Sequence, residues 1–195
     1  MATGEIVIVA ARRTPIGAFQ GTLAAATAQD LGAAAIGGAI AAAGIGTEDV
    51  DQVLMGCVLP AGLGQAPARQ AAIGAGIPVG TPCTPINTLC GSGMMSIMLG
   101  FDQILAGSAS IVVAGGLESM SNAPYLLPRA RSGYRMGHQE VLDHMFYDGL
   151  QDPWEGQMMG HSAEQTARKY EFSREAQDAF AIESATRAQG AVADG

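Results

Sequence analysis

The residue best suited to do chemistry in this chain is Cys90, which lies in the segment 87–95 (NTLCGSGMM). Proline and isoleucine precede this segment, and an apolar run follows it to residue 106. This order predicts a strand, a tight turn and a buried helix, with the thiol at the first turn of the helix. Unpaired backbone N–H groups and the positive end of the helix dipole both favour a thiolate there. We therefore expect Cys90 to be the nucleophile of an acyl-transfer site.

The residues beside Cys90 support this hypothesis without completing it. Gly91 and Gly93 carry no side chain, so a substrate or another loop can approach closely. A second interpretation stays open, because most free cysteines are small buried hydrophobic residues. A cysteine that attacks an acyl carbonyl also needs a base and an oxyanion hole. The local sequence offers the thiol and its backbone N–H groups, and it identifies no base.

The other possible sites are disfavoured by spacing. Cys57, Cys83 and Cys90 have no C-x-x-C or Cys–His zinc spacing, and an odd number of cysteines does not fit a disulfide framework. The sequence has no phosphate-binding glycine motif and no G-x-S-x-G nucleophile turn. The histidines also lack metal-ligand spacing, and each is expected to be solvated or to cap a helix; they are His138, His144 and His161. We expect no metal and no cofactor.

Composition limits the partners and the compartment. The chain has 195 residues, of which 48% are hydrophobic and only 14% charged, and this low charge suggests buried contacts in a homo-oligomer. A net charge of −8 argues against nucleic acid and anionic membrane surfaces. The cysteine usage fits a reducing compartment, so we expect the cytoplasm. Residues 1–6 contain Glu5 and no basic segment before an apolar core, so no secretory signal is expected.

Strands and helices are expected to alternate through the first part of the chain. The expected strands are residues 5–11, 50–59, 84–89 and 110–114. The expected helices are residues 28–43, 67–75 and 94–106, the first of them announced by Thr27-x-x-Asp30. This alternation predicts an α/β fold with a mostly parallel sheet covered by helices on both faces. Ligands of such folds bind at the carboxyl ends of the strands, where Cys90 is expected.

The helix that follows Cys90 carries a regular apolar stripe. Large apolar side chains recur at helical spacing, at Met94, Ile97, Met98, Phe101 and Leu105. We expect this stripe to face the protein core.

The composition changes near residue 120. Residues 1–120 hold 3 basic and 7 acidic side chains, whereas residues 121–195 hold 7 and 11 in a much shorter span. Ser162-x-x-Gln165 predicts the start of one helix, and Ser173 can cap another. We interpret residues 121–195 as a large insertion or as the start of another subdomain.

Several segments, taken together, resemble the signatures of thiolases (acetyl-CoA acyltransferases). They are residues 13–17 (RTPIG), 67–72 (PARQAA), 87–93 (NTLCGSG), 114–121 (AGGLESMS), 147–150 (YDGL), 159–164 (MGHSAE) and 173–181 (SREAQDAFA). The resemblance covers nearly the whole chain.

The resemblance implies a thiolase-like fold with five layers, αβαβα, built from two similar halves. Residues 1–120 would form the core of the N-terminal half, and residues 121–195 the first part of a loop domain that covers the substrate. It also implies cleavage or formation of 3-ketoacyl-CoA, with the acyl group held as a thioester on Cys90. Coenzyme A would be a substrate, and the enzyme a dimer or tetramer.

The same resemblance places Leu150, Met158 and Met159 at the CoA and acyl pocket. Short-chain biosynthetic thiolases often read His-Met-Gly where this chain reads Met-Met-Gly at residues 158–160. An apolar Met158 removes a polar contact near the thioester. Longer or branched acyl groups therefore remain possible substrates.

The chain has about half the usual thiolase length. The family's catalytic histidine, in His-Pro-x-Gly, and its second cysteine, in Cys-x-Gly-Gly, are not among these residues. We therefore expect no sustained turnover from this chain alone, and a separate C-terminal half is an expected partner.

Two alternatives stay open: a related condensing enzyme of the same fold, and a truncated, non-catalytic fragment that acts only through interactions.

Overall fold

A computed structural model describes residues 4–194, so the first three residues of the segment inspected for a secretory signal lie outside the described part. The chain divides into two compact units, Met1–Gly149 and Leu150–Gly195. The predicted boundary at residue 120 came from composition and from the thiolase resemblance. It marks where a loop domain would begin, and it stays a prediction.

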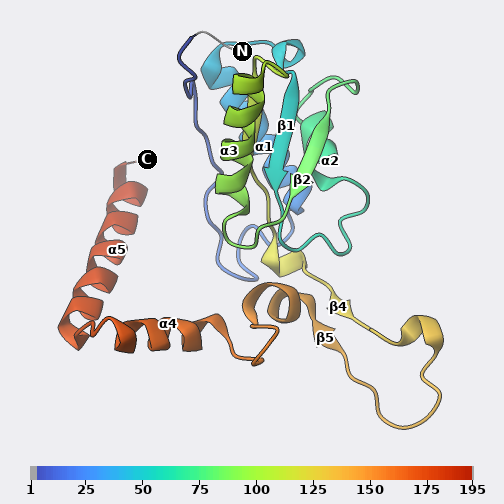
Figure 1. The fold of residues 1–195 in the computed structure, drawn as a ribbon, viewed down its shortest axis with the longest axis vertical. Helices are drawn as coiled ribbons and strands as arrows, with labels where there is room; N and C mark the ends of the chain where they lie inside the picture. Colours follow the sequence, from blue (N-terminus) through green and yellow to red (C-terminus); the bar gives the residue numbers. More distant parts are fainter. Residues whose placement is uncertain (1–3, 195) are drawn as a thin grey trace. The chain divides into compact units, whose positions relative to one another are not determined.

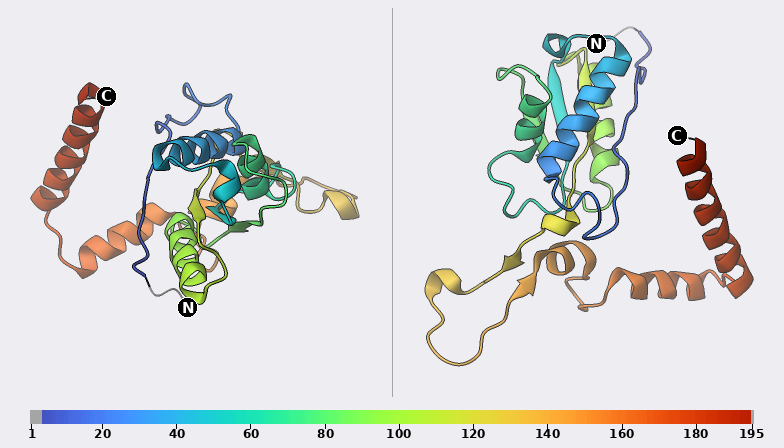
Figure 2. Two further views of the ribbon diagram at one scale, coloured as in Figure 1. Left: turned by 90° about the horizontal axis from the view of Figure 1, so that it is seen from above. Right: turned by 180° about the vertical axis from the view of Figure 1, so that it is seen from behind.

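The first unit is built on a three-stranded parallel sheet with helices on both faces. The strand order is β2 (Cys83–Ile86), β1 (Gln52–Gly56) and β3 (Val112–Gly116). The helices α1 (Ala28–Ala43) and α2 (Pro67–Gly74) cover one face, and α3 (Ser92–Ala106) covers the other (Figures 1 and 2). The predicted α/β architecture with a parallel sheet is therefore confirmed.

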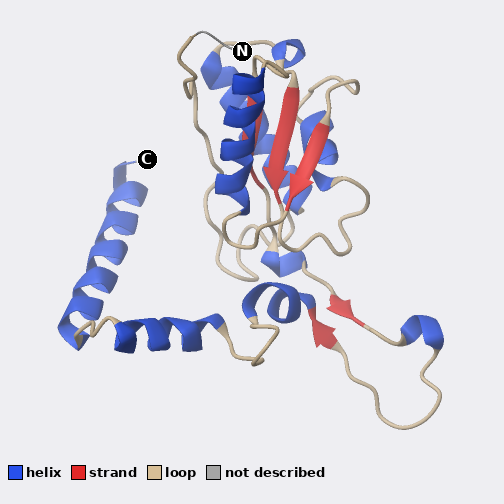
Figure 3. Ribbon diagram, in the orientation of Figure 1, coloured by secondary structure: helices blue, strands red, loops and turns tan. Residues whose placement is uncertain are grey.

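The other elements in residues 4–194 are short turns, a ladder of two short strands and the last two helices, as Figure 3 also shows. The antiparallel ladder joins β4 (Tyr125–Leu126) to β5 (Leu142–Asp143). The 3₁₀ turns are Thr47–Asp49, Met120–Asn122 and Ala130–Ser132, a π-helical turn spans Phe146–Leu150, and the last helices are α4 (Met159–Lys169) and α5 (Arg174–Asp194).

The main core lies between α1, α2 and the sheet. The predicted capping box starts α1, since the backbone N–H of Asp30 donates to Thr27 Oγ1 and that of Thr27 donates to Asp30 Oδ2, each at 3.1 Å. The two helices approach each other closely at Gly32, where an added Cβ would lie only 3.1 Å from Ala71 Cβ. The buried apolar residues of this core are Ala28, Ile36, Ile40, Val50, Val53, Met55, Cys57, Ala68, Ala71, Ala72, Ile77 and Leu117.

The predicted orientation of α3 is wrong. Small residues face the sheet: Ser92, Ser96 and Gly100 are buried, and a Cβ at Gly100 would lie 3.1 Å from Val112 Cγ1. The backbone of α3 lies too close to the sheet for large side chains. The apolar stripe therefore points outward, with Met94 exposed by 70% and Phe101 by 48%.

With its large apolar side chains, α3 has the length and composition of a membrane-spanning helix. The window Leu89–Ala106 is long and apolar enough to cross a membrane, with a mean hydropathy of 1.3, and 17% of it is buried. Length and composition alone meet this test, and core helices of soluble proteins meet it as well. One side of α3 packs on β1 and β3, so this helix is part of the fold of the first unit.

The strand predicted at residues 5–11 is not present in the described part of the chain. These residues have no ladder partner, and Val7, Ile8 and Val9 are all more than half exposed. An apolar segment becomes a strand only when a neighbour satisfies its backbone N–H and C=O groups. Residues 4–194 provide no such neighbour for this segment.

The helices of the second unit begin partly as predicted. Ser173 caps α5, because its Oγ accepts from the backbone N–H of Ala176 at 3.1 Å. The capping box predicted at Ser162 is wrong, since α4 begins three residues earlier and Ser162 lies inside it. Met158 occupies the N-cap position there without a side-chain hydrogen bond.

Asp51 ties the start of β1 to the start of β3. Its Oδ2 accepts from the backbone N–H of Ser110 at 2.7 Å and of Ile111 at 3.0 Å. These two bonds lower the pKa of the carboxyl, so its stabilising effect is present above the ordinary pKa and is lost as the pH falls through the lowered one.

We therefore expect Asp51→Asn to be less stable than the unsubstituted chain at neutral pH. The difference should shrink as the pH falls below the ordinary carboxyl pKa of 3.8 and through the lowered one, where the carboxylate of the unsubstituted chain becomes protonated. Urea unfolding across this pH range measures the difference. A gap that is independent of pH would contradict this assignment.

Candidate active site

Cys90 lies in the turn between β2 and α3, at the carboxyl edge of the sheet. It is an exposed thiol and precedes the N-cap residue Gly91, so it stands just before the helix rather than in its first turn. No side chain caps α3, and its first N–H groups are therefore not taken by a capping side chain. A group bound at the sulfur would meet the positive end of this helix.

The turn that carries Cys90 is conformationally strained. Leu89 has a φ of 52°, in the left-handed region that costs a non-glycine residue roughly 1–2 kcal/mol. Side chains hold both polar groups of its backbone. Its N–H donates to Asn87 Oδ1 at 2.9 Å, and its carbonyl accepts from the Ser92 hydroxyl at 2.6 Å.

The last residue of β1 lies directly beneath the start of α3. A Cβ at Gly56 would be 2.6 Å from the carbonyl carbon of Ser92 and 2.7 Å from the amide nitrogen of Gly93. Contacts this short are prohibitive, and both atoms belong to the backbone. Glycine at position 56 therefore lets the helix start sit on the strand end, which sets the height of the Cys90 turn above the sheet.

Glu118 fixes the neighbouring loop. Its carboxylate oxygens accept from the backbone N–H groups of Val58 at 2.8 Å and of Leu59 at 2.9 Å. The carbonyl of Val58 in turn accepts from Asn87 Nδ2 at 3.4 Å. The loop after β1 is thus connected to the segment after β3 and to the Cys90 turn.

The other two thiols lie in different environments. Burial, followed by the charge of Glu118, raises the pKa of Cys57 to about 11, so this thiol stays protonated near neutral pH. Burial also raises the pKa of Cys83, although the nearby Arg69 opposes the shift. Cys90 is the exposed cysteine of the three, so it is the one that a molecule in solution can reach most easily.

Comparison with known proteins assigns the family. Residues 6–195 match the thiolase N-terminal domain. The chain belongs to the thiolase family. It is 49% identical over 193 residues to the acetyl-CoA acetyltransferase of Schizosaccharomyces pombe, covering 99% of this chain and 49% of that protein. It is 50% identical to the acetyl-CoA acetyltransferase of Chromobacterium violaceum and 49% identical to the mitochondrial enzyme of Mus musculus, each over 96% of this chain, with 48% and 44% of those proteins covered.

This thiolase chain therefore spans about half the length of the curated relatives it matches. The matched half is the N-terminal domain, and the predicted family and fold are confirmed.

The three pocket residues predicted from the resemblance lie in the second unit of the thiolase chain. Leu150 is half-buried at the end of the π-helical turn, whereas Met158 and Met159 are exposed at the start of α4. Gln151 and Met158 form a β-bridge, which brings Leu150 close to the methionines within this unit. Their role at a CoA pocket stays a prediction, as does the catalytic role of Cys90.

His144 does not lie where the sequence led us to expect. It is buried, its Nδ1 lies 2.6 Å from Asp148 Oδ2, and its Nε2 accepts from the backbone N–H of Ala61 at 3.3 Å. Because Nε2 accepts, the hydrogen is on Nδ1 and is donated to Asp148. The interpretation of His144 as a solvated or capping residue is wrong, and the i, i+4 spacing to Asp148 was the missed signal.

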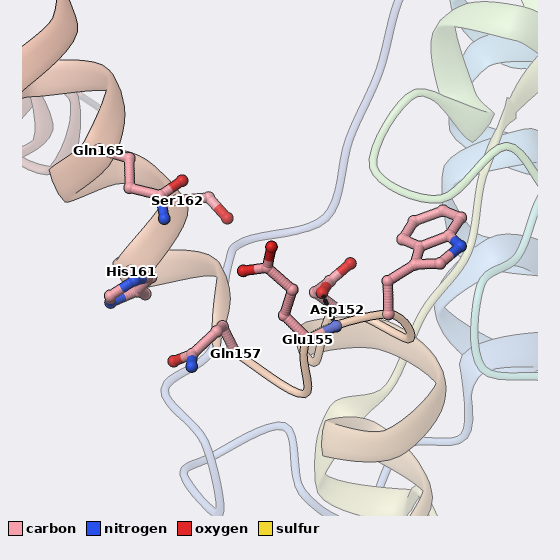
Figure 4. A pocket seen from close by; sticks show the side chains of 7 residues that line it. Asp152, Glu155, Gln157, His161, Ser162 and Gln165 are labelled. Carbon is pink, nitrogen blue, oxygen red and sulfur yellow. Dashed lines mark hydrogen bonds between the residues drawn. The ribbon is translucent and has the colours of Figure 1, made fainter.

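The second unit carries an open polar depression of about 250 Å³ around the loop before α4 (Figure 4). Its labelled side chains are Asp152, Glu155, Gln157, His161, Ser162 and Gln165. Figure 4 shows them spread along the loop and the first turns of α4 rather than converging on one point. Residues 4–194 contain no group of three or more histidine, cysteine or acidic side chains able to hold a metal ion. We assign no chemistry to this depression.

Replacing Glu118 with glutamine is expected to destabilise the thiolase chain by about 1–3 kcal/mol, because one N–H of the loop loses its acceptor. Urea unfolding measures this loss. The exposed Glu164, replaced in the same way in the second unit, serves as the control and should change stability by less than about 0.5 kcal/mol. Equal stability of the two variants would contradict the structural role of Glu118.

Proposed function

We propose that this chain supplies the acyl-accepting half of a thiolase that forms or cleaves 3-ketoacyl-CoA, with Cys90 as the nucleophile. The observation that carries the proposal is an exposed thiol on a tightly held turn, just before an uncapped helix, in the segment that resembles the acyl-enzyme signature. The acetyl-CoA acetyltransferases that match this chain support the reaction class.

The proposed first step is acylation of Cys90. Its thiolate attacks the carbonyl carbon of an acyl-CoA, and negative charge develops on the carbonyl oxygen. The N–H groups of Gly91 and Ser92 are bonded within the turn, so the N–H groups that follow them in the first turn of α3 are the ones proposed to stabilise this charge. The carbonyl then re-forms, coenzyme A leaves as its thiolate, and the acyl group remains on Cys90 as a thioester.

The thiolase resemblance assigns two further groups to the other half of the enzyme. A histidine deprotonates the Cys90 thiol for the first step, and a second cysteine moves a proton at the attacking carbon in the later steps. We therefore propose that this chain alone can be acylated slowly but does not turn over. Coenzyme A takes part as a substrate, and no further cofactor is proposed.

Acetyl transfer to the chain tests the proposal. After incubation with acetyl-CoA, peptide mass spectrometry should find an acetyl group on Cys90 and none on Cys57 or Cys83. Acetylation of all three thiols to the same extent, or of none of them, would overturn the assignment. Steady-state thiolysis by the purified chain would refute the expected lack of turnover.

The proposed substrate range rests on Met158. Its thioether offers an apolar contact where short-chain biosynthetic thiolases often present an imidazole. We propose that longer or branched acyl groups are accepted together with acetyl, and that Leu150 and Met159 line the same pocket. Competing acetyl-CoA against a branched acyl-CoA for Cys90 compares the two classes directly.

We propose that the outer stripe of α3 is covered in the assembled enzyme, either by a C-terminal thiolase half or by another copy of the chain. Five large apolar residues of one helix are each at least 46% exposed, and a surface of this kind favours association. Light scattering of the purified chain should therefore give a mass above that of the monomer. A monodisperse monomer would count against this proposal.

We also propose a cytoplasmic location, because the cysteine usage fits a reducing compartment.

A further inference from the structure

The turn that carries Cys90 depends on one buried hydroxyl. Ser92 is only 4% exposed, and its Oγ makes two hydrogen bonds to the turn. It donates to the carbonyl of Leu89 at 2.6 Å and accepts from the backbone N–H of Thr88 at 2.9 Å. A hydroxyl has one hydrogen to donate and lone pairs to accept, so both bonds can form together.

These bonds act on the two residues that precede the thiol. Leu89, with its φ of 52°, is the strained residue of the turn, and Ser92 holds its carbonyl. Without the hydroxyl, the carbonyl of Leu89 keeps only the backbone N–H of Ser92, at 2.9 Å, and the N–H of Thr88 loses its acceptor. Leu89 could then relax toward an ordinary backbone conformation, which would move the adjacent Cys90.

The packing beneath Ser92 explains why a small side chain stands there. Gly56 lies so close that a Cβ added to it would be 2.7 Å from Ser92 Cβ. A larger residue at position 92 would collide with the end of β1. Alanine fits the same space and removes only the hydroxyl, so the substitution isolates the two hydrogen bonds.

We propose that Ser92 is a positioning residue, whose buried hydroxyl holds the strained turn at Leu89 and thereby orients the Cys90 thiol. The inference rests on the proposed acyl-transfer role of Cys90. Ser92 does not touch the reacting atoms, and its effect is exerted through the backbone of residues 88–90.

Ser96 provides a matched control. It lies one turn further along α3, is fully buried, and its Oγ lies 2.7 Å from the carbonyl oxygen of Gly93 and 2.8 Å from that of Gly115. Replacing Ser96 with alanine removes a buried hydroxyl from the same helix face and leaves residues 87–90 untouched. A general loss of helix packing would affect both variants alike, whereas a positioning role affects only Ser92→Ala.

The test compares Ser92→Ala and Ser96→Ala in the full chain. Ser92→Ala should slow acetylation of Cys90 by acetyl-CoA about tenfold or more, since misplacing a reacting group is costly, whereas Ser96→Ala should change it less than about twofold. Amide exchange at Thr88 should become about tenfold faster in Ser92→Ala alone. Equal slowing by both variants, or unchanged exchange at Thr88, would overturn the inference.

A second variant tests the route through Leu89. Glycine adopts a positive φ without cost, so Leu89→Gly should restore part of the acetylation rate lost in Ser92→Ala. If Ser92→Ala does not fold, Leu89→Gly/Ser92→Ala is compared with Leu89→Gly, and a rate reduced by less than about threefold is expected because the strain is gone. An equal loss in both backgrounds would overturn the role of Leu89. Should the unsubstituted chain show no acetylation, the acyl-transfer proposal fails, and the exchange at Thr88 still decides the role of Ser92.

Discussion

Cys90→Ala is expected to take up no acetyl group from acetyl-CoA, and the rate of acyl transfer should fall by at least about a thousandfold. The sulfur is the atom that forms the new bond, and neither of the other thiols can replace it. Cys57 is buried, with a pKa raised to about 11 by burial and by Glu118, so it presents almost no thiolate near neutral pH. Removing the exposed thiol therefore removes the nucleophile.

Single-turnover transfer from radiolabelled acetyl-CoA measures this loss. Cys83→Ala is the matched control, because it also removes a cysteine. Cys83 lies in β2, the strand that leads into the Cys90 turn. Its uptake should stay within about twofold of the unsubstituted chain, as for substitutions away from the reacting atoms. Acetyl uptake by Cys90→Ala at the native rate would exclude Cys90 as the acyl acceptor.

Gly56→Ala is expected to destabilise the chain by about 3 kcal/mol, which corresponds to a fall of roughly 6–12 °C in Tm. The new Cβ would meet backbone atoms of Ser92 and Gly93 at 2.6 Å and 2.7 Å, and backbone cannot rotate away as a side chain can. Either β1 or the start of α3 must shift. Because Cys90 directly precedes the N-cap residue of α3, a shift of the helix start would move the thiol. Acetylation of Cys90 should therefore slow as well.

Gly37→Ala separates this effect from the general consequences of adding a methyl group. Gly37 lies within α1, and a Cβ there has nothing within 4 Å. Alanine at this position should raise stability by about 0.5–1 kcal/mol, because glycine weakens a helix interior. Thermal unfolding of the two variants gives opposite shifts if the packing at Gly56 is as described. A Gly56→Ala chain as stable as Gly37→Ala would contradict it.

Much of the site could be predicted because its signals are local. The order of strand, turn and helix around Cys90 can be predicted from consecutive residues. The cap of α1 needs only Thr27 and Asp30, three positions apart, and Gly44 ends the same helix with a φ of 68°. These contacts form between near neighbours in the chain, so their residue types suffice to predict them.

The interactions that hold the turn were not predictable in the same way. Glu118 accepts from Val58 and Leu59, some sixty positions earlier, and nothing in its own segment indicates those donors. The close approach of Gly56 to Ser92 likewise depends on how α3 lies on the sheet. The positive φ of Leu89 is carried by a residue type that rarely adopts it, so only the folded chain reveals the strain.

The sequence by itself therefore determined the thiolase resemblance, the helices, the parallel α/β architecture and the position of the exposed cysteine. Tertiary structure alone decided which side of each element is buried. The apolar stripe of α3 reads as a core face, yet Ser96 and Gly100 take that place because β1 and β3 leave no room for larger groups. The apolar residues 5–11 read as a strand, yet within residues 4–194 no neighbouring strand completes their hydrogen bonds. Periodicity shows that a face is apolar, whereas burial depends on which surface comes to lie against it.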